Sequence, residues 1–177
     1  MSVAPANAPI DQAVAENNAA LARFIAAARA VPEGAADRPI KQASWTPAQV
    51  VEHVAITAEA AAAAVRGEGF GKVPWIMPLF RPLLRNWFNG VLKRNAFPEQ
   101  SKGPSVLRPS ESPAAIAVSI ARLERETAVA NAVMRDFAMR GDGSFKHPVF
   151  GRLSVVDYVR FGALHTVHHA AQLDGVR

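Results

Sequence analysis

The chain has 177 residues and a net charge of +5, half of its residues are hydrophobic, and it contains no cysteine. This length suits a single domain with a sizeable core, and we treat residues 1–177 as one helical domain. Because cysteine is absent, disulfides, cysteine-ligated zinc sites and a cysteine nucleophile are excluded. The sequence shows neither a signal peptide nor an apolar run long enough for a transmembrane helix, so we expect a cytoplasmic protein.

Alanine-rich segments with apolar residues at helical spacing predict a helical protein. The first helix is predicted at about 10–30, after a flexible segment of residues 1–9. The second helix has a clear start in SWTPAQVVEHV. Thr46 is the predicted N-cap, Pro47 occupies the first turn, and Gln49 is placed to complete a capping box. This helix is predicted to end at about residue 66, before a glycine-containing turn.

Residues 70–111 are expected to form an irregular insertion or crossover. Prolines at positions 74, 78 and 82 would break a long helix, so a helix is predicted only from about Pro82 to Asn95. The segment 70–97 carries five basic residues and no acidic residue, while the rest of the chain has 15 of each. The whole positive excess of the protein therefore lies in this segment.

Two further long helices are predicted in the C-terminal half. One begins with Ser112 as its N-cap and ends at about Met139, and the other begins with Ser154 as its N-cap and ends at about Asp174. The glycine-rich stretch 140–153 between them reads as a loop. Four long amphipathic helices favour an all-α four-helix bundle, with an extra basic and aromatic helical segment between the second and fourth long helices.

Three of the five histidines lie in HTVHH near the C-terminus. His165 and His169 are four residues apart, so a helix places both imidazoles on one face, where they can share one metal ion. His53 lies on the side of the second helix that carries apolar and small residues, so it should point into the bundle. Three imidazoles leave coordination positions open, as in catalytic metal sites. The alternative is that these are hydrogen-bonded core histidines, because this spacing also arises by chance.

Two stretches, WTPAQVVEHV and HTVHHAAQL, resemble the DinB-like superfamily of bacterial metal-binding four-helix bundles. The segment KHPVFGRLSVVDYVRFGALHTVHHAAQL resembles a subfamily with a His-Pro-x-Phe-Gly turn before the last helix. The resemblance covers residues 44–66 and 146–173, and it implies that His53, His165 and His169 hold a divalent metal. Zinc or nickel suits imidazole ligands, and manganese or iron remain alternatives.

The resemblance implies thiol-dependent transfer or isomerisation with bacillithiol, mycothiol or glutathione. A divalent metal lowers the pKa of a bound thiol, as it does of bound water, and a chain without cysteine would need the thiol of a cosubstrate. Many relatives carry Arg-Gly-Gln after the last histidine, whereas this chain has Ala170-Ala171-Gln172. The substrate class therefore stays open. A metal-dependent hydrolase and a non-catalytic bundle are the alternatives.

Three residues outside the histidine triad are further candidates. Arg81 and Arg85, with Lys93 or Arg94 as alternatives, are predicted to bind the carboxylate of a low-molecular-weight thiol, although a run of charges is usually a solvated face. His147 precedes the last helix and is a candidate acid–base residue. The alternative for this His-Pro pair is turn chemistry.

The basic segment also interleaves aromatic and cationic residues, with Trp75, Phe80, Trp87 and Phe88 among them. We rank packing against the bundle or a homodimer contact first, and the surface of an anionic membrane second. No nucleic-acid-binding motif accompanies these residues, so no nucleic-acid partner is expected. The expected partners are a small-molecule substrate and a thiol cosubstrate.

Overall fold

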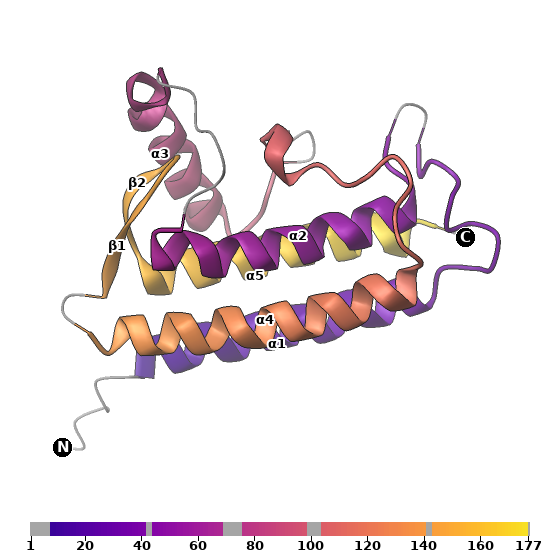
Figure 1. The fold of residues 1–177 in the computed structure, drawn as a ribbon, viewed down its shortest axis with the longest axis horizontal. Coiled ribbons are helices and arrows are strands. Elements are labelled where there is room, and N and C mark those ends of the chain that lie inside the picture. The colour runs from indigo at the N-terminus through magenta and orange to yellow at the C-terminus, as the bar shows by residue number, and fades with distance from the viewer. Residues whose placement is uncertain (1–7, 42–43, 69–75, 99–103, 141–142, 177) are drawn as a thin grey trace.

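The computed structural model describes residues 8–41, 44–68, 76–98, 104–140 and 143–176. Its body consists of four long helices lying side by side: α1 (Ala8–Arg29), α2 (Pro47–Arg66), α4 (Ile116–Ala138) and α5 (Val155–Asp174) (Figure 1). Helix α1 packs most extensively against α5, and α2 against α4. The predicted four-helix bundle is therefore confirmed. None of the described helices has the length and apolar character that a membrane crossing requires.

The N-terminal region differs slightly from its prediction. Residues 8 and 9 belong to α1 and are not part of a flexible segment, while residues 1–7 lie outside the described residues. Helix α1 begins early because Pro9 fits the first turn, where its missing N–H needs no partner. Asp11 also lies in the first turn and suits the positive end of the helix dipole.

Helix α2 begins and ends as predicted. The Thr46 side chain accepts a hydrogen bond from the Gln49 backbone N–H, and the Gln49 side chain accepts one from the Thr46 N–H. At the other end Gly67 adopts a left-handed conformation with φ 77°, which glycine reaches without steric cost. These caps fix the helix that carries His53.

The helix in the basic segment is longer than predicted. Helix α3 spans Met77–Arg94 and contains Pro82 in its interior, so the expectation of a break there was wrong. Pro78 occupies the first turn, where it is harmless, and Pro82 removes only one intrahelical hydrogen bond. The buried ring of Phe88, stacked on Phe161 of α5 at 4.7 Å, anchors the helix despite that loss. The expected extra helical segment is thus present, while Trp75 and Lys72 lie outside the described residues.

Helix α4 begins at Ile116 without a side-chain cap, so the prediction that Ser112 is its N-cap was wrong. The preceding segment is bound to α2 instead. The Ser110 backbone N–H donates to the Glu52 carboxylate at 2.6 Å, and the Ser110 carbonyl accepts from the Gln49 amide at 3.0 Å. These tertiary hydrogen bonds bind the chain before Ser112 to α2, and the helix begins only at Ile116.

The stretch predicted as a loop before α5 contains a β-hairpin. Strands β1 (Ser144–His147) and β2 (Gly151–Ser154) pair antiparallel, and Phe145 and Leu153 face each other in the core. Four-residue strands are too short to give a clear alternating pattern in the sequence. Helix α5 then begins with the Ser154 side chain as its cap, as predicted.

Two apolar clusters form the core. One contains Val14, Phe88, Phe145 and Tyr158 at the hairpin end of the bundle. The other contains residues near the opposite end, among them Phe24, Val51, Leu123 and Leu173. On α5, His165 and His169 lie between the stretches that enter these two clusters.

Candidate metal centre

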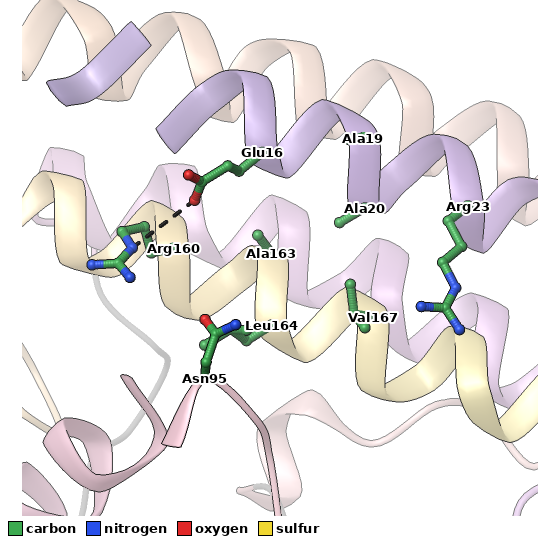
Figure 2. A pocket seen from close by; sticks show the side chains of 9 residues that line it. All are labelled: Glu16, Ala19, Ala20, Arg23, Asn95, Arg160, Ala163, Leu164 and Val167. Carbon is green, nitrogen blue, oxygen red and sulfur yellow. Dashed lines mark ion pairs between the residues drawn. The ribbon is translucent and has the colours of Figure 1, made fainter. Parts of the chain in front are cut away.

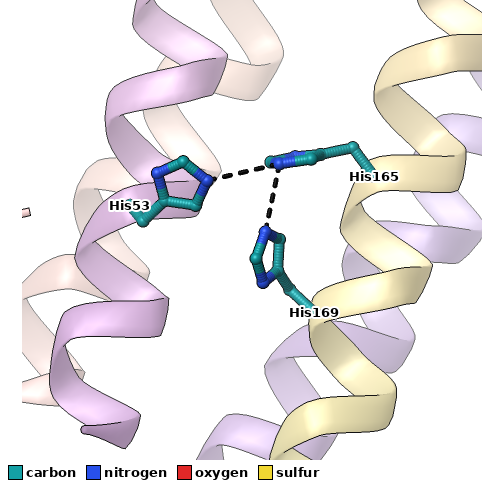
Figure 3. Close-up of side chains that lie close together, drawn as sticks. All are labelled: His53, His165 and His169. Atoms are coloured by element: carbon teal, nitrogen blue, oxygen red, sulfur yellow. Dashed lines mark hydrogen bonds between the residues drawn. The ribbon is translucent and has the colours of Figure 1, made fainter. Parts of the chain in front are cut away.

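Three histidines from two helices point toward one another (Figure 3). The Nε2 atom of His165 on α5 lies 3.3 Å from Nε2 of His53 on α2 and 3.0 Å from Nε2 of His169. One ligand atom of each ring lies within 4.8 Å of the others. His53 and His169 are buried, at 4% and 5% exposure, whereas His165 is partly exposed. The structure thus brings together all three residues predicted as metal ligands.

Hydrogen bonds at Nδ1 determine which nitrogen each ring offers to the centre. His53 Nδ1 lies 2.7 Å from the Leu107 carbonyl oxygen, which can only accept, so Nδ1 carries the proton. His169 Nδ1 lies 2.8 Å from Oε1 of Gln172 and donates to it in the same way. In both neutral rings the lone pair therefore belongs to Nε2, the atom that faces the centre.

Burial keeps these imidazoles neutral. Loss of solvation lowers the pKa of His53, and it lowers the pKa of His169 to about 3, with the nearby His53 adding to the effect. The pKa of His165 is also held well below its usual value, first by burial and then by the neighbouring histidines. At neutral pH all three rings are in the form that binds a metal ion.

The donor set fits a divalent cation. His165 Nε2 has at most one proton, so it can satisfy only one of the two lone pairs directed at it. The lone pair at the other close contact then has no proton to accept, and a cation at the centre would satisfy it. Two imidazole nitrogens bound to one tetrahedral zinc ion at about 2.0–2.1 Å are about 3.3 Å apart, close to the separations here. Among the described residues, this is the group of histidine and acidic side chains able to hold a metal.

Aromatic rings surround the three histidines. The Trp45 ring lies 4.6 Å from that of His53, and the Phe97 ring lies 5.3 Å from that of His165. Phe97 also contacts Phe161 at 4.8 Å, and Phe161 stacks on Phe88 of α3. Aromatic contacts therefore connect the centre to α3. Apolar walls of this kind lower the local dielectric and strengthen electrostatic interactions at the centre.

The sequence of residues 16–173, which is most of the chain, matches the family model of the DinB superfamily. The chain belongs to the DinB superfamily. A solved structure, the crystal structure of TT2238, a four-helix bundle protein, is similar with a TM-score of 0.56 and 20% sequence identity. The match covers 92% of this chain and 95% of that chain, and at this identity it shows the fold alone. No curated protein matches the chain.

In this DinB superfamily protein the two predicted thiol-binding arginines lie against the hairpin. Arg81 donates to the Pro148 carbonyl at 3.4 Å, and Arg85 donates to the carbonyl of Arg152. Both therefore connect α3 to the hairpin. Binding of a thiol carboxylate by these arginines stays a prediction.

His147 occupies the end of β1. Its Nδ1 accepts hydrogen bonds from the backbone N–H groups of Val149 and Phe150, at 3.1 and 3.2 Å, which is the turn chemistry considered as the alternative. Its ring packs against Phe150 at 4.8 Å and Tyr158 at 5.2 Å. Tyr158 precedes His165 on α5 by about two helical turns. An acid–base role for His147 stays a prediction.

Two partners of the metal centre escaped the sequence analysis. The Leu107 carbonyl comes from a 3-10 turn (Ser105–Leu107) that no local pattern connects to His53. Gln172 links two rings, because its Oε1 accepts from His169 while its Nε2 lies 3.1 Å from Nε2 of His168. The sequence analysis noted Gln172 only in the comparison with relatives, and its position three residues after His169 indicates this contact, since side chains at that spacing meet on a helix.

A hollow of about 380 Å³ lies elsewhere, between α1 and α5 (Figure 2). Alanines line much of it, and Glu16 and Arg160 face each other across it at 3.9 Å. None of the three histidines lines this hollow. The adjacent residue Leu164 does, because consecutive residues on a helix point about 100° apart.

Proposed function

We propose that this DinB superfamily protein is a divalent-metal-dependent transferase or isomerase that uses a low-molecular-weight thiol. The observation that carries the proposal is the convergence of three neutral imidazole nitrogens from His53, His165 and His169. Three protein ligands leave at least one position for an exogenous ligand, which is the arrangement of catalytic zinc sites.

The chemistry follows from that ligand set and from the composition of the chain. A divalent ion held by the three histidines would lower the pKa of a bound thiol and so supply a thiolate nucleophile at neutral pH. Because the chain has no cysteine, the thiol comes from a cosubstrate. In a transfer reaction its sulfur forms a bond to the electrophilic carbon, the leaving group departs, and the thiol proton passes to solvent.

The residues of the chain have distinct roles in this proposal. The three histidines hold the ion, while the Leu107 carbonyl and the Gln172 amide keep two of the rings in the required tautomer. Trp45 and Phe97 restrict water at the centre and offer apolar surface to the substrate.

The first test is the metal content of tag-free protein by elemental analysis. Wild type should contain near-stoichiometric metal, and His53→Ala and His169→Ala should lose it. His168→Ala is the matched control, because His168 lies next to His169 and bonds to the same glutamine but is not a ligand. Wild-type protein that binds neither zinc, nickel nor manganese would overturn the proposal.

The second test concerns the thiol. Cobalt-substituted protein should develop a near-ultraviolet thiolate-to-cobalt absorption when glutathione, mycothiol or bacillithiol binds, and it should consume that thiol in the presence of epoxides or activated aryl halides. Ester or amide hydrolysis without any thiol, together with no thiolate absorption, would replace the transferase by the hydrolase alternative.

A further inference from the structure

One face of α3 exposes a continuous apolar stripe. Its members are four residues at the spacing of a single helix face, with exposed fractions of 39, 77, 49 and 67%: Ile76, Leu79, Phe80 and Leu83. They are half of the large hydrophobic side chains exposed among the described residues. A cluster of this kind on a folded protein indicates an interaction surface.

The stripe is not core material, because another face of α3 already packs against the protein. Phe88 and Val91 are buried, and Trp87 contacts Phe150 and Phe161. Among the aromatic residues singled out in the sequence, Phe88 therefore belongs to the core, whereas Phe80 belongs to the exposed stripe. Figure 1 shows α3 standing away from the four long helices, beside the hairpin.

Further along α3, the surface has a depression and carries two cationic side chains. A depression of about 420 Å³ is lined by Asn86, Asn89, Lys93 and Arg94, among others, and begins at Leu83. Gly90 also lines it, and the Arg94 guanidinium lies 3.1 Å from the position that a Cβ at Gly90 would take. Lys93 and Arg94 make no ion pair with any acidic residue in the described part of the chain.

The electrostatics of this region have one sign. Residues 76–98 and the hairpin, residues 144–154, contain six basic residues and no acidic residue, whereas the other 14 basic residues are offset by 15 acidic ones. The two segments contact each other through Arg81 and Arg85. On the outward side of the hairpin, Lys146 and Arg152 are paired across the strands and exposed.

We propose that this α3 face docks on the surface of a membrane that contains anionic lipids. The stripe of Ile76, Leu79, Phe80 and Leu83 inserts at the boundary between headgroups and acyl chains, and Lys93 and Arg94 bind lipid phosphates. An apolar helix face combined with unpaired cations is the physical requirement for such interfacial binding. A second copy of the chain is a poorer occupant, because pairing two α3 faces would bring cations of both copies together.

Sedimentation with vesicles tests the proposal on the full chain. Wild type should bind phosphatidylcholine vesicles that contain phosphatidylserine, bind pure phosphatidylcholine weakly, and dissociate at high salt. Leu79→Ser/Leu83→Ser should weaken binding at least about tenfold, through lost insertion. The matched control is Val118→Ser/Val129→Ser, which removes exposed valines from α4 and should leave binding unchanged.

The charged part is tested separately. Lys93→Glu/Arg94→Glu should weaken binding more than about tenfold at low salt, since each cation near an anionic surface contributes roughly fivefold. Arg38→Glu/Lys41→Glu makes the same change in net charge on exposed residues elsewhere and should have little effect. Circular dichroism establishes that each variant is folded.

Three results would overturn the proposal. The first is wild type that fails to sediment with phosphatidylserine vesicles, and the second is a loss of binding in the control variants as large as that in the α3 variants. The third is a wild-type dimer in light scattering that Leu79→Ser/Leu83→Ser converts to a monomer, without vesicle binding by either. That outcome would make the stripe an interface between two copies.

Discussion

His53 and His147 are both buried, but their rings have opposite hydrogen-bonding roles. In His53, Nδ1 donates to the Leu107 carbonyl and leaves the Nε2 lone pair facing two other imidazoles. In His147, Nδ1 accepts from the N–H groups of Val149 and Phe150, so in the neutral ring the proton lies on Nε2. One ring is prepared to bind a cation, and the other stabilises a turn.

This difference shows that burial alone does not indicate what a histidine does. Burial lowers the pKa of both rings, and it leaves both neutral at pH 7. The group opposite Nδ1 decides which nitrogen keeps a lone pair and where that lone pair points. A carbonyl oxygen or an amide oxygen at Nδ1 is therefore the informative feature of the metal centre.

The largest expected effect is the loss of a ligand. Removing a hydrogen-bond partner of a ligand typically weakens metal binding about 10–100-fold. His53→Ala or His169→Ala removes the ligand itself and should weaken binding further. His147→Asn should leave metal affinity unchanged, because its ring has the opposite role. Competition titration with a chromophoric chelator measures both. Equal losses in His53→Ala and His147→Asn would erase the distinction between the two rings.

The next effect is the pH dependence of stability at His147. Burial lowers its pKa to about 4, against about 6.5 in an unfolded chain, so the unfolded state binds more protons between these values. The contribution of His147 to the free energy of unfolding is complete above about pH 6.5. It falls by about 3 kcal/mol as the pH drops to about 4.

His147→Asn removes this titration while keeping an oxygen that can accept the turn N–H groups. Denaturant unfolding of both proteins at several pH values should show a shallower pH dependence in the variant. Lost ring packing lowers the stability of the variant at every pH and does not change that slope. Identical slopes would show that His147 is not the group that titrates.

A smaller effect is expected from the partner of His169. Gln172→Ala removes the acceptor at Nδ1 and should weaken metal binding about 10–100-fold without removing a ligand. Gln12→Ala is the control, because the Gln12 side chain donates to Glu16 on the exposed surface of α1. Unchanged affinity in Gln172→Ala would mean that the ring of His169 is oriented by packing alone.

The smallest effect concerns the start of α2. Thr46→Ala removes one half of the capping box and should lower the free energy of unfolding by about 1 kcal/mol. Metal affinity should not change, because His53 lies about two turns into the helix. Thermal unfolding and chelator titration on the same samples separate the two quantities. A loss of affinity would show that the helix end also positions the ligand.

Much of the bundle was predictable from local sequence. Thr46 and Gln49 lie three residues apart, as do Ser154 and Asp157, so the caps of α2 and α5 are encoded within one helical turn. Where tertiary contacts compete, the local rules failed. Ser112 has a cap-forming side chain, but hydrogen bonds bind Ser110 to α2 and the helix begins only at Ile116.

The proline-rich segment shows the same competition in the other direction. Pro82 predicts a helix boundary, yet α3 continues through it because Phe88 packs against Phe161 and the arginines bind the hairpin. The free energy lost with one hydrogen bond is smaller than the free energy gained when an aromatic side chain is buried. The sequence alone gives no measure of that burial.

The pairing of His165 with His169 and the inward direction of His53 depend on helical periodicity, so the sequence by itself determined which three rings can meet. Only the tertiary structure decided that they do, because His53 and His165 are separated by 112 positions and are joined by the packing of α2 beside α5. It also decided the tautomer of His53, through a carbonyl 54 positions away, and the exposure of the α3 stripe. Periodicity is a property of neighbouring residues, whereas proton position and exposure depend on which distant groups the fold brings into contact.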